Sequence, residues 1–265
     1  MLILLSPAKS LDYDSPLSTE KWSTPELLDH SQELVEVMAT KQPDEIGQLM
    51  KISRALAETN FDRFQDWSTP FTPENARPAL LAFHGDVYVG LNAPATFSER
   101  DFEFAQSSLR ILSGLYGVLR PLDLMQPYRL EMGTRLATNR GADLYEFWGD
   151  VITDHLQLAL EASPGSKVLV NLASNEYFKS VKKARVGAPI IAPRFLDTKD
   201  GQQKVIAMFA KRARGAMAAW MIKNRVRTVQ DLDQFDLLGY RYDPEQSTET
   251  QPVYTRLEED RTVAA

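Results

Sequence analysis

Four of the charged side chains within a largely apolar stretch, residues 109–133, are the first candidates for chemistry. They are Arg120, Asp123, Arg129 and Glu131. Burying a lone charge is costly, so these groups must pair with one another or face a wet cleft. Two interpretations stay open: a buried connector with internal ion pairs, or the wall of a binding site. Two glycines and two prolines exclude one long helix here: Gly114, Gly117, Pro121 and Pro127.

A second feature is a strongly basic part of the chain, residues 179–227. It contains thirteen lysines and arginines and only two acids, Asp197 and Asp200, so it carries a charge of +11. Because the whole chain carries −6, the rest of it carries −17. Such asymmetry favours a localised site for an anion on an otherwise acidic protein. The alternative is a solvated basic face that pairs with the acidic part.

Two predicted elements would position basic groups for such a site. In a predicted helix from Ala210 to about Asn224, Lys211 and Arg214 lie beside each other on the side opposite the apolar face. A phosphate backbone would contact the helix on that side. The first strand leads into Ser6-Pro7-Ala8-Lys9. Ligands often bind at the carboxyl ends of strands in open α/β sheets. A surface turn with an incidental lysine is an equal alternative for Lys9.

A helical outgrowth, residues 25–67, contains a second candidate site between two short helices. A pair joined this tightly is typical of a helix-hairpin-helix, whose backbone N–H groups hold a phosphate oxygen. Lys51 and Ser53 stand where glycine normally permits the close backbone approach, so an ordinary αα-hairpin is an equal alternative. The candidate phosphate-binding residues at the joint are Leu49, Met50, Lys51, Ile52, Ser53 and Arg54.

The remaining patterns predict one mixed α+β domain over residues 1–258, with a mixed sheet beside the helical outgrowth. Residues 79–91 are expected to form two short strands around a turn at His84-Gly85-Asp86. The apolar spacing over residues 142–162 predicts a single amphipathic helix. We expect the tail, residues 259–265, to be disordered.

Composition excludes several classes of site. The chain has no cysteine, which excludes disulfides, a thiolate nucleophile and cysteine-ligated metals. It has only three histidines, so we expect neither a metal site nor a cofactor, and direct iron binding is disfavoured. No glycine-rich nucleotide loop or hydrolase motif is present. Asp123, Glu131 and Glu176 are candidate acids, but the sequence gives no two of them a shared geometry, so no catalytic residue is assigned.

The sequence also bears on location. No apolar run approaches the roughly 20 residues of a membrane-spanning helix. The apolar stretch at residues 1–5 has no basic leader and is followed at once by Ser6-Pro7, which is typical of a strand and not of a signal peptide. We therefore expect a cytoplasmic monomer that does not associate with membranes.

Several long blocks resemble one protein family in the same order along the chain. The chain is similar to the YaaA family of bacterial peroxide-stress resistance proteins over nearly its whole length. The blocks that carry the resemblance are Met1–Tyr13, Leu112–Gly133, Phe147–Asp150, Asn171–Ser174, Glu176–Ser180 and Ala210–Gly215.

The resemblance implies a cytoplasmic protein of the oxidative stress response that keeps intracellular iron low under peroxide and so limits Fenton damage. It also implies an unusual mixed α/β fold, a helix-hairpin-helix at Leu49–Ala57 and a positively charged cleft that binds DNA with little dependence on base sequence. It implies no catalytic activity. The matching cleft residues are Lys9, Arg120, Arg129, Lys179, Lys182, Lys211, Arg212 and Arg214.

One alternative stays open beside DNA binding. The same cleft would suit an enzyme that acts on a small anionic or nucleotide-like substrate. Arg120 and Arg129 would then hold the substrate, and Asp123 or Glu131 would act as the acid or base.

Overall fold

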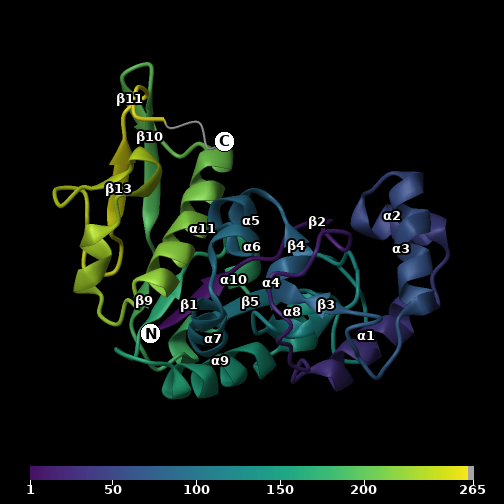
Figure 1. The fold of residues 1–265 in the computed structure, drawn as a ribbon. Coiled ribbons are helices and arrows are strands. Elements are labelled where there is room, and N and C mark those ends of the chain that lie inside the picture. Colours follow the sequence, from purple (N-terminus) through teal and green to yellow (C-terminus); the bar gives the residue numbers. More distant parts are fainter. Residues whose placement is uncertain (262–265) are drawn as a thin grey trace.

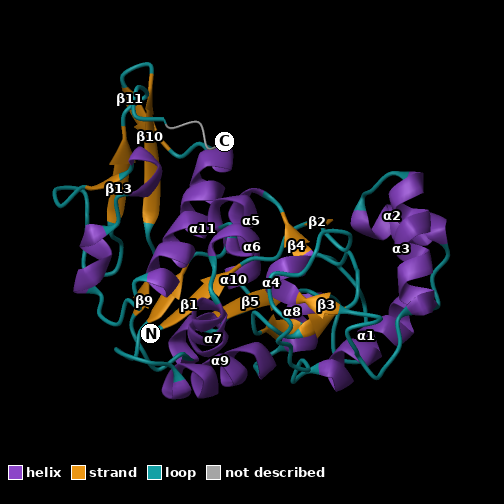
Figure 2. Ribbon diagram, in the orientation of Figure 1, coloured by secondary structure: helices purple, strands orange, loops and turns teal. Residues whose placement is uncertain are grey.

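The computed structural model describes residues 1–261 and confirms the mixed α+β class (Figures 1 and 2). Its centre is a five-stranded sheet in which the first strand lies in the middle. The strand order is β6 (Gly117–Leu119), β5 (Leu109–Ser113), β1 (Leu2–Leu5), β8 (Leu169–Asn171) and β9 (Ile190–Ile191). The strands β5, β1, β8 and β9 run parallel, whereas β6 is antiparallel to β5. Every residue of β1 is apolar and buried, as expected for a strand covered on both faces.

A second sheet of four strands stands beside the first, where we had expected a single sheet. Its order is β11 (Gln202–Lys204), β10 (Arg194–Lys199), β13 (Val253–Arg256) and β12 (Arg241–Tyr242). Two short antiparallel pairs complete the strands: β2 (Ser10–Leu11) with β4 (Phe83–His84), and β3 (Arg77–Pro78) with β7 (Leu124–Met125).

The helices surround the central sheet and separate it from the second one (Figure 2). Figure 1 shows α11 running between the two sheets. The α-helices are α1 (Leu28–Ala39), α2 (Pro43–Met50), α3 (Arg54–Asp66), α4 (Ala79–Ala82), α5 (Asp86–Leu91), α6 (Ala93–Thr96), α7 (Glu99–Ser108), α8 (Leu144–Trp148), α9 (Val151–Ala162), α10 (Asn175–Phe178) and α11 (Ala207–Lys223). Three short 3₁₀ helices follow α10 or α11: Lys183–Arg185, Gln230–Gln234 and Leu237–Gly239.

The predicted helical outgrowth is present as α1, α2 and α3, and Figure 1 places α2 and α3 on the opposite side of the molecule from the second sheet. The Ser53 hydroxyl caps α3 by accepting the N–H of Leu56. Lys51 takes the left-handed conformation, with φ of 54°, that ends α2. The two helices and their tight joint are therefore as predicted, and the phosphate-binding role of the joint stays a prediction.

Two predicted elements were wrong in detail. Residues 79–91 form α4, the two-residue β4 and α5, and not a pair of strands. Ala79-Leu-Leu-Ala82 is buried on every side, so it has no period that separates helix from strand, and its residues favour a helix. The helix expected over residues 142–162 is split into α8 and α9 at Gly149, whose φ of 49° is unfavourable for other residues.

Of the tail predicted to be disordered, residues 262–265 lie outside the described residues. Arg261 is described: its side chain donates to the Thr198 carbonyl at 2.7 Å and pairs with Glu258 at 2.7 Å.

The closest helix contact in the fold joins α5 to α11 at two glycines. A Cβ atom on Gly215 would lie 1.7 Å from the carbonyl oxygen of Val87, and one on Gly90 would lie 2.1 Å from that of Arg212. Only glycine permits backbones to approach this closely. The contact fixes α11, and with it the basic side chains of that helix, against the loop that precedes α5.

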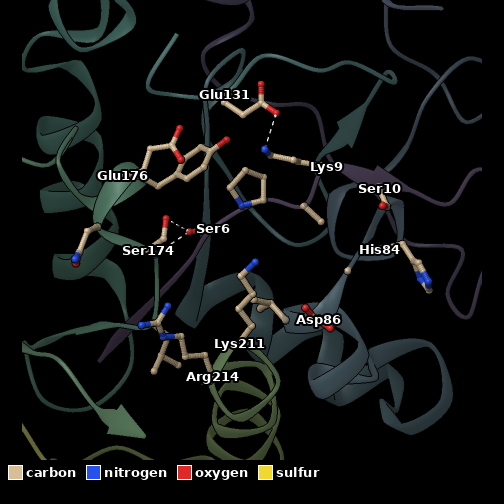
Figure 3. A pocket seen from close by; sticks show the side chains of 17 residues that line it. Ser6, Lys9, Ser10, His84, Asp86, Glu131, Ser174, Glu176, Lys211 and Arg214 are labelled. Atoms are coloured by element: carbon tan, nitrogen blue, oxygen red, sulfur yellow. Dashed lines mark hydrogen bonds and ion pairs between the residues drawn. The ribbon is translucent and has the colours of Figure 1, made fainter. Parts of the chain in front are cut away.

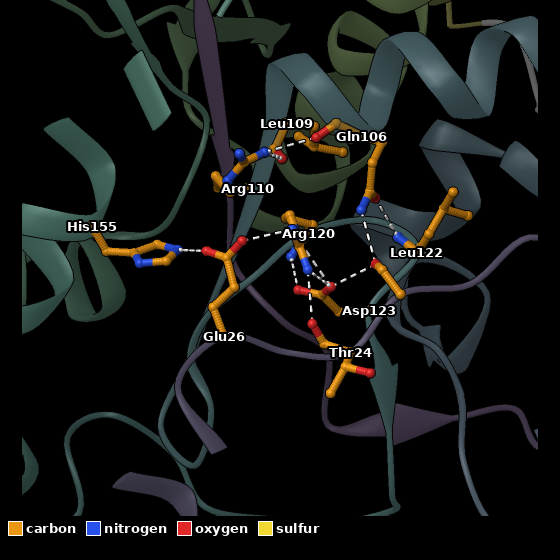
Figure 4. Close-up of polar contacts among 10 residues, drawn as sticks. Thr24, Glu26, Gln106, Leu109, Arg110, Arg120, Leu122, Asp123 and His155 are labelled. Atoms are coloured by element: carbon orange, nitrogen blue, oxygen red, sulfur yellow. Dashed lines mark hydrogen bonds and ion pairs between the residues drawn. The ribbon is translucent and has the colours of Figure 1, made fainter. Parts of the chain in front are cut away.

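The ion pair of Arg120 and Asp123 ties the apolar stretch 109–133 to the start of the outgrowth (Figure 4). Asp123 is 1% exposed and accepts the Arg120 backbone N–H at 2.7 Å, its Nε at 2.9 Å and the Ser23 hydroxyl at 2.7 Å. Arg120 also donates to Glu26 at 2.6 Å and to the Thr24 carbonyl at 2.7 Å. Burial raises the pKa of Asp123, while the bonds from Arg120 oppose that rise.

The same network extends to the helices beneath the sheet. The carboxylate of Glu26 also contacts Nε2 of His155 at 2.9 Å, and burial lowers the pKa of that histidine. Arg110 is buried beside them and donates to the carbonyls of Gln106 and Leu109. Burial lowers its pKa to about 10. These charges tie the start of the outgrowth to β5, α7 and α9.

We expect Gly215→Ala to lower the free energy of unfolding by about 3 kcal/mol, because the new methyl group would overlap the backbone of α5. Gly47→Ala is the matched control: its Cβ would meet nothing closer than 3.6 Å, so it should raise the stability by up to about 1 kcal/mol through helix propensity. Urea titrations of both variants measure the difference. Equal stabilities would show that the α5–α11 contact is not tight.

We expect Asp123→Asn to lower the free energy of unfolding by about 2 kcal/mol, because the variant loses a buried charge that accepts three hydrogen bonds. Glu58→Gln breaks the exposed ion pair with Arg54 and should change the free energy of unfolding by less than about 0.5 kcal/mol. Chemical denaturation of the two variants makes the comparison. A loss of the same size in both would contradict a structural role for Asp123.

Candidate functional site

A cleft of about 600 Å³ opens at the carboxyl ends of β1 and β8 (Figure 3). This is the edge of a parallel sheet at which ligands usually bind. Its residues come from the segments after β1 and β8, the start of α5, the end of the stretch 109–133, and α11. They are Ser6, Pro7, Ala8, Lys9, Ser10, His84, Gly85, Asp86, Val87, Glu131, Leu172, Ser174, Asn175, Glu176, Tyr177, Lys211 and Arg214.

Two cations of α11 form one wall of the cleft. Lys211 and Arg214 are three residues apart and therefore lie on the same side of the helix. Within residues 1–261, the guanidinium of Arg214 has no hydrogen-bond or ion-pair partner, although it is half-buried. Burial lowers the pKa of Arg214, yet an arginine keeps its charge at neutral pH. A half-buried cation without a partner is a ready binding point for an anion.

Two carboxylates lie on the opposite side, near Lys9. Glu131 is 16% exposed and contacts Nε of Arg129 at 3.1 Å and Nζ of Lys9 at 3.6 Å, so its charge is compensated. Glu176 accepts the backbone N–H of Gly133 at 3.0 Å. A Cβ atom on Gly133 would lie 3.1 Å from the same Glu176 oxygen, so glycine leaves room for this carboxylate.

Two serines line the floor of the cleft. The Ser6 hydroxyl lies 3.2 Å from that of Ser174 and accepts the Ser174 backbone N–H at 2.8 Å. Among the described residues, no histidine or carboxylate contacts either hydroxyl, so nothing activates a serine nucleophile. The pair can offer hydrogen bonds to a bound group.

The charges that line the cleft balance. Its three cations are matched by three carboxylates, whereas the resemblance implies a positively charged cleft. The cations are Lys9, Lys211 and Arg214, and the carboxylates are those of Asp86, Glu131 and Glu176. The cleft is therefore of mixed charge, with Lys211 and Arg214 concentrated on α11.

The structure brings some of the predicted cleft residues together and separates others. Lys9, Lys211 and Arg214 line the cleft, and Arg129 lies next to it in a small cavity that it shares with Lys9 and Glu131. Arg212 lies behind the wall and pairs with Asp86 at 3.6 Å.

The other three predicted residues do not line the cleft. Arg120 is engaged in the network with Asp123, Glu26 and Thr24. Lys179 places its ammonium 4.5 Å from the centre of the Tyr145 ring. Lys182 is exposed.

The hairpin residues 49–54 form a separate surface. None of them lines the cleft, and they lie on the outgrowth at the far side of the molecule from α11 (Figure 1). Lys51, Ser53 and Arg54 are exposed, and Arg54 pairs with Glu58 at 2.9 Å.

Sequence reasoning missed His84, Asp86 and Ser174 as lining residues. His84 and Asp86 were missed because residues 79–91 were predicted as a β-hairpin. That prediction did not place them near the carboxyl ends of β1 and β8. Ser174 lies three residues beyond the end of β8, at the same sheet edge as Ser6. That placement after a parallel strand is the signal that could have identified it.

Neither a metal site nor a membrane-spanning helix is found among the described residues. No group of three or more histidine, aspartate or glutamate side chains within residues 1–261 is arranged to hold a metal ion. Over the same part of the chain, no helix combines the length and the apolar character that crossing a membrane requires.

The comparison with known families agrees with the resemblance seen in the sequence. A family model described as peroxide stress protein YaaA matches residues 1–246. The match includes the cleft, the outgrowth with its hairpin and the whole of α11. The chain therefore belongs to the YaaA family of peroxide stress proteins.

Proposed function

We propose that this peroxide stress response protein binds DNA by contacting the phosphate groups of the DNA backbone. The observation that supports the proposal is the half-buried guanidinium of Arg214, which has no partner within residues 1–261 and lies beside Lys211 in the cleft. An arginine can hold a phosphate with two parallel hydrogen bonds, and a neighbouring lysine adds a point charge. Such contacts bind DNA without reading its sequence.

The hairpin supplies a second contact in this proposal. The N-terminus of α3 directs backbone N–H groups toward solvent beside the exposed side chains of Lys51 and Arg54. Ser53 already satisfies one of these groups by accepting the Leu56 N–H. Because the hairpin and the cleft lie on different parts of the molecule, a nucleic acid that used both would have to extend across the surface between them.

We further propose, from membership of the family, that the protein helps to lower intracellular iron under peroxide and so limits Fenton damage. This role requires no iron site in the protein itself. Whole-cell electron paramagnetic resonance of chelatable iron tests it in cells that lack the protein. Wild-type protein should restore a low iron level after peroxide treatment, and an unchanged level would contradict the role.

Replacing both Lys211 and Arg214 by Ala should weaken duplex DNA binding by at least about tenfold, because two phosphate contacts are lost. The loss should be similar on all base sequences, and the slope of log K against log salt should fall by about 2. Fluorescence-anisotropy titrations at several salt concentrations measure both quantities.

The control is Lys223→Ala, which removes one exposed positive charge at the other end of α11 and should leave binding within about twofold. The double variant Lys51→Ala with Arg54→Ala measures how much the hairpin contributes to DNA binding. An absence of salt-dependent binding by the wild-type protein at low ionic strength would overturn the proposal.

A further inference from the structure

We infer that the cleft binds a small molecule that carries a phosphate or carboxylate at one end and a protonated amine at the other. The inference goes beyond DNA binding, because it assigns a ligand to the carboxylates of the cleft as well as to its cations. It draws on the positions of Lys211 and Arg214 in the cleft, on the contact of Glu176 and on the compensation of Glu131.

The anionic end belongs at the wall formed by α11. Arg214 has no partner within residues 1–261 and is half-buried, so a bound anion would satisfy its N–H groups. Lys211 extends into the same space (Figure 3). The hydroxyls of Ser6 and Ser174 lie at the floor and can add neutral hydrogen bonds. A phosphate or a carboxylate would suit this wall equally.

The amine end belongs at Glu176. Its carboxylate is held by the Gly133 N–H and, among the described residues, no lysine or arginine lies within ion-pair distance of it. Glu131 differs from it, since Arg129 and Lys9 already compensate its charge. A protonated amine bound at Glu176 would therefore supply the positive charge that this carboxylate lacks.

The size and lining of the cleft fit such a ligand. About 600 Å³ lies within the range of small-molecule sites. The apolar side chains of Pro7, Ala8, Val87 and Leu172 line the cleft beside the charged groups and can pack against a carbon skeleton. A small ligand with a phosphate at both ends would place one of them beside Glu176, where like charges oppose binding.

The test compares two series of probes in calorimetric titrations without nucleic acid. The first series contains ω-aminoalkyl phosphates, from ethyl to pentyl, and the second contains alkyl phosphates of the same lengths. At the best length, the aminoalkyl phosphate should bind about fivefold more tightly than its partner, as expected for one added ion pair. Titration of DNA is a separate measurement, so failure of one proposal does not decide the other.

Three variants assign the two ends. Glu176→Gln should abolish the preference for the amine while keeping alkyl phosphate binding or strengthening it. Arg214→Gln should weaken both series by about tenfold, as for a lost charge-assisted hydrogen bond. Glu161→Gln, which removes an exposed carboxylate of α9 outside the cleft, should change neither series. Circular dichroism confirms that each variant is folded.

Two results would overturn the inference. The first is no saturable binding of either series by the folded wild-type protein at about 10 mM, well above the affinity of a weak small-molecule site. The second is equal affinity for both series at every chain length in the wild-type protein.

Discussion

The candidate site depends on the close contact between α5 and α11. Gly90 and Gly215 let the two backbones meet at distances that a single methyl group would forbid. That contact holds Lys211 and Arg214 of α11 over the ends of β1 and β8, and it also fixes Asp86, the first residue of α5, and with it His84 of β4. One steric constraint thus places groups from three distant parts of the sequence in a single cleft.

The charges of the stretch 109–133 have two different tasks, although they lie close together in sequence. Arg120 and Asp123 are bonded to each other and to the start of the outgrowth, so they stabilise the fold. Arg129 and Glu131 are bonded in the same manner but lie at the cleft. The first interpretation, a connector with internal ion pairs, therefore holds for Arg120 and Asp123. Arg129 and Glu131 lie where the second would place them, and their role in binding stays a prediction. The carboxylates of the two pairs differ in burial, since Asp123 is 1% exposed and Glu131 is 16% exposed.

Part of this arrangement follows from local sequence and part does not. The helices α2, α3 and α11 were predicted, because an amphipathic helix carries its own period. The fully buried run at residues 79–82 has no such period, which explains why α4 and α5 were mistaken for strands. The place of Lys9 in the cleft follows from the end of the first strand, and that of Lys211 follows from the polar face of its helix. The position of Arg120 depends on Glu26 and Thr24, from a distant segment, and no local pattern contains that information.

The basic segment 179–227 shows why a count of charges does not define a binding surface. Arg185, Arg212 and Arg225 all pair with aspartates from outside the segment, so their charges are largely compensated. Only Lys211 and Arg214 from this segment line the cleft, and carboxylates line the same space. Affinity for an anion would therefore depend on the few cations without a partner, and most of all on Arg214, whose side chain is half-buried. Selectivity depends on which carboxylates the fold leaves uncompensated beside it. For this reason the contacts of Glu176 are as informative about the ligand as the cations themselves.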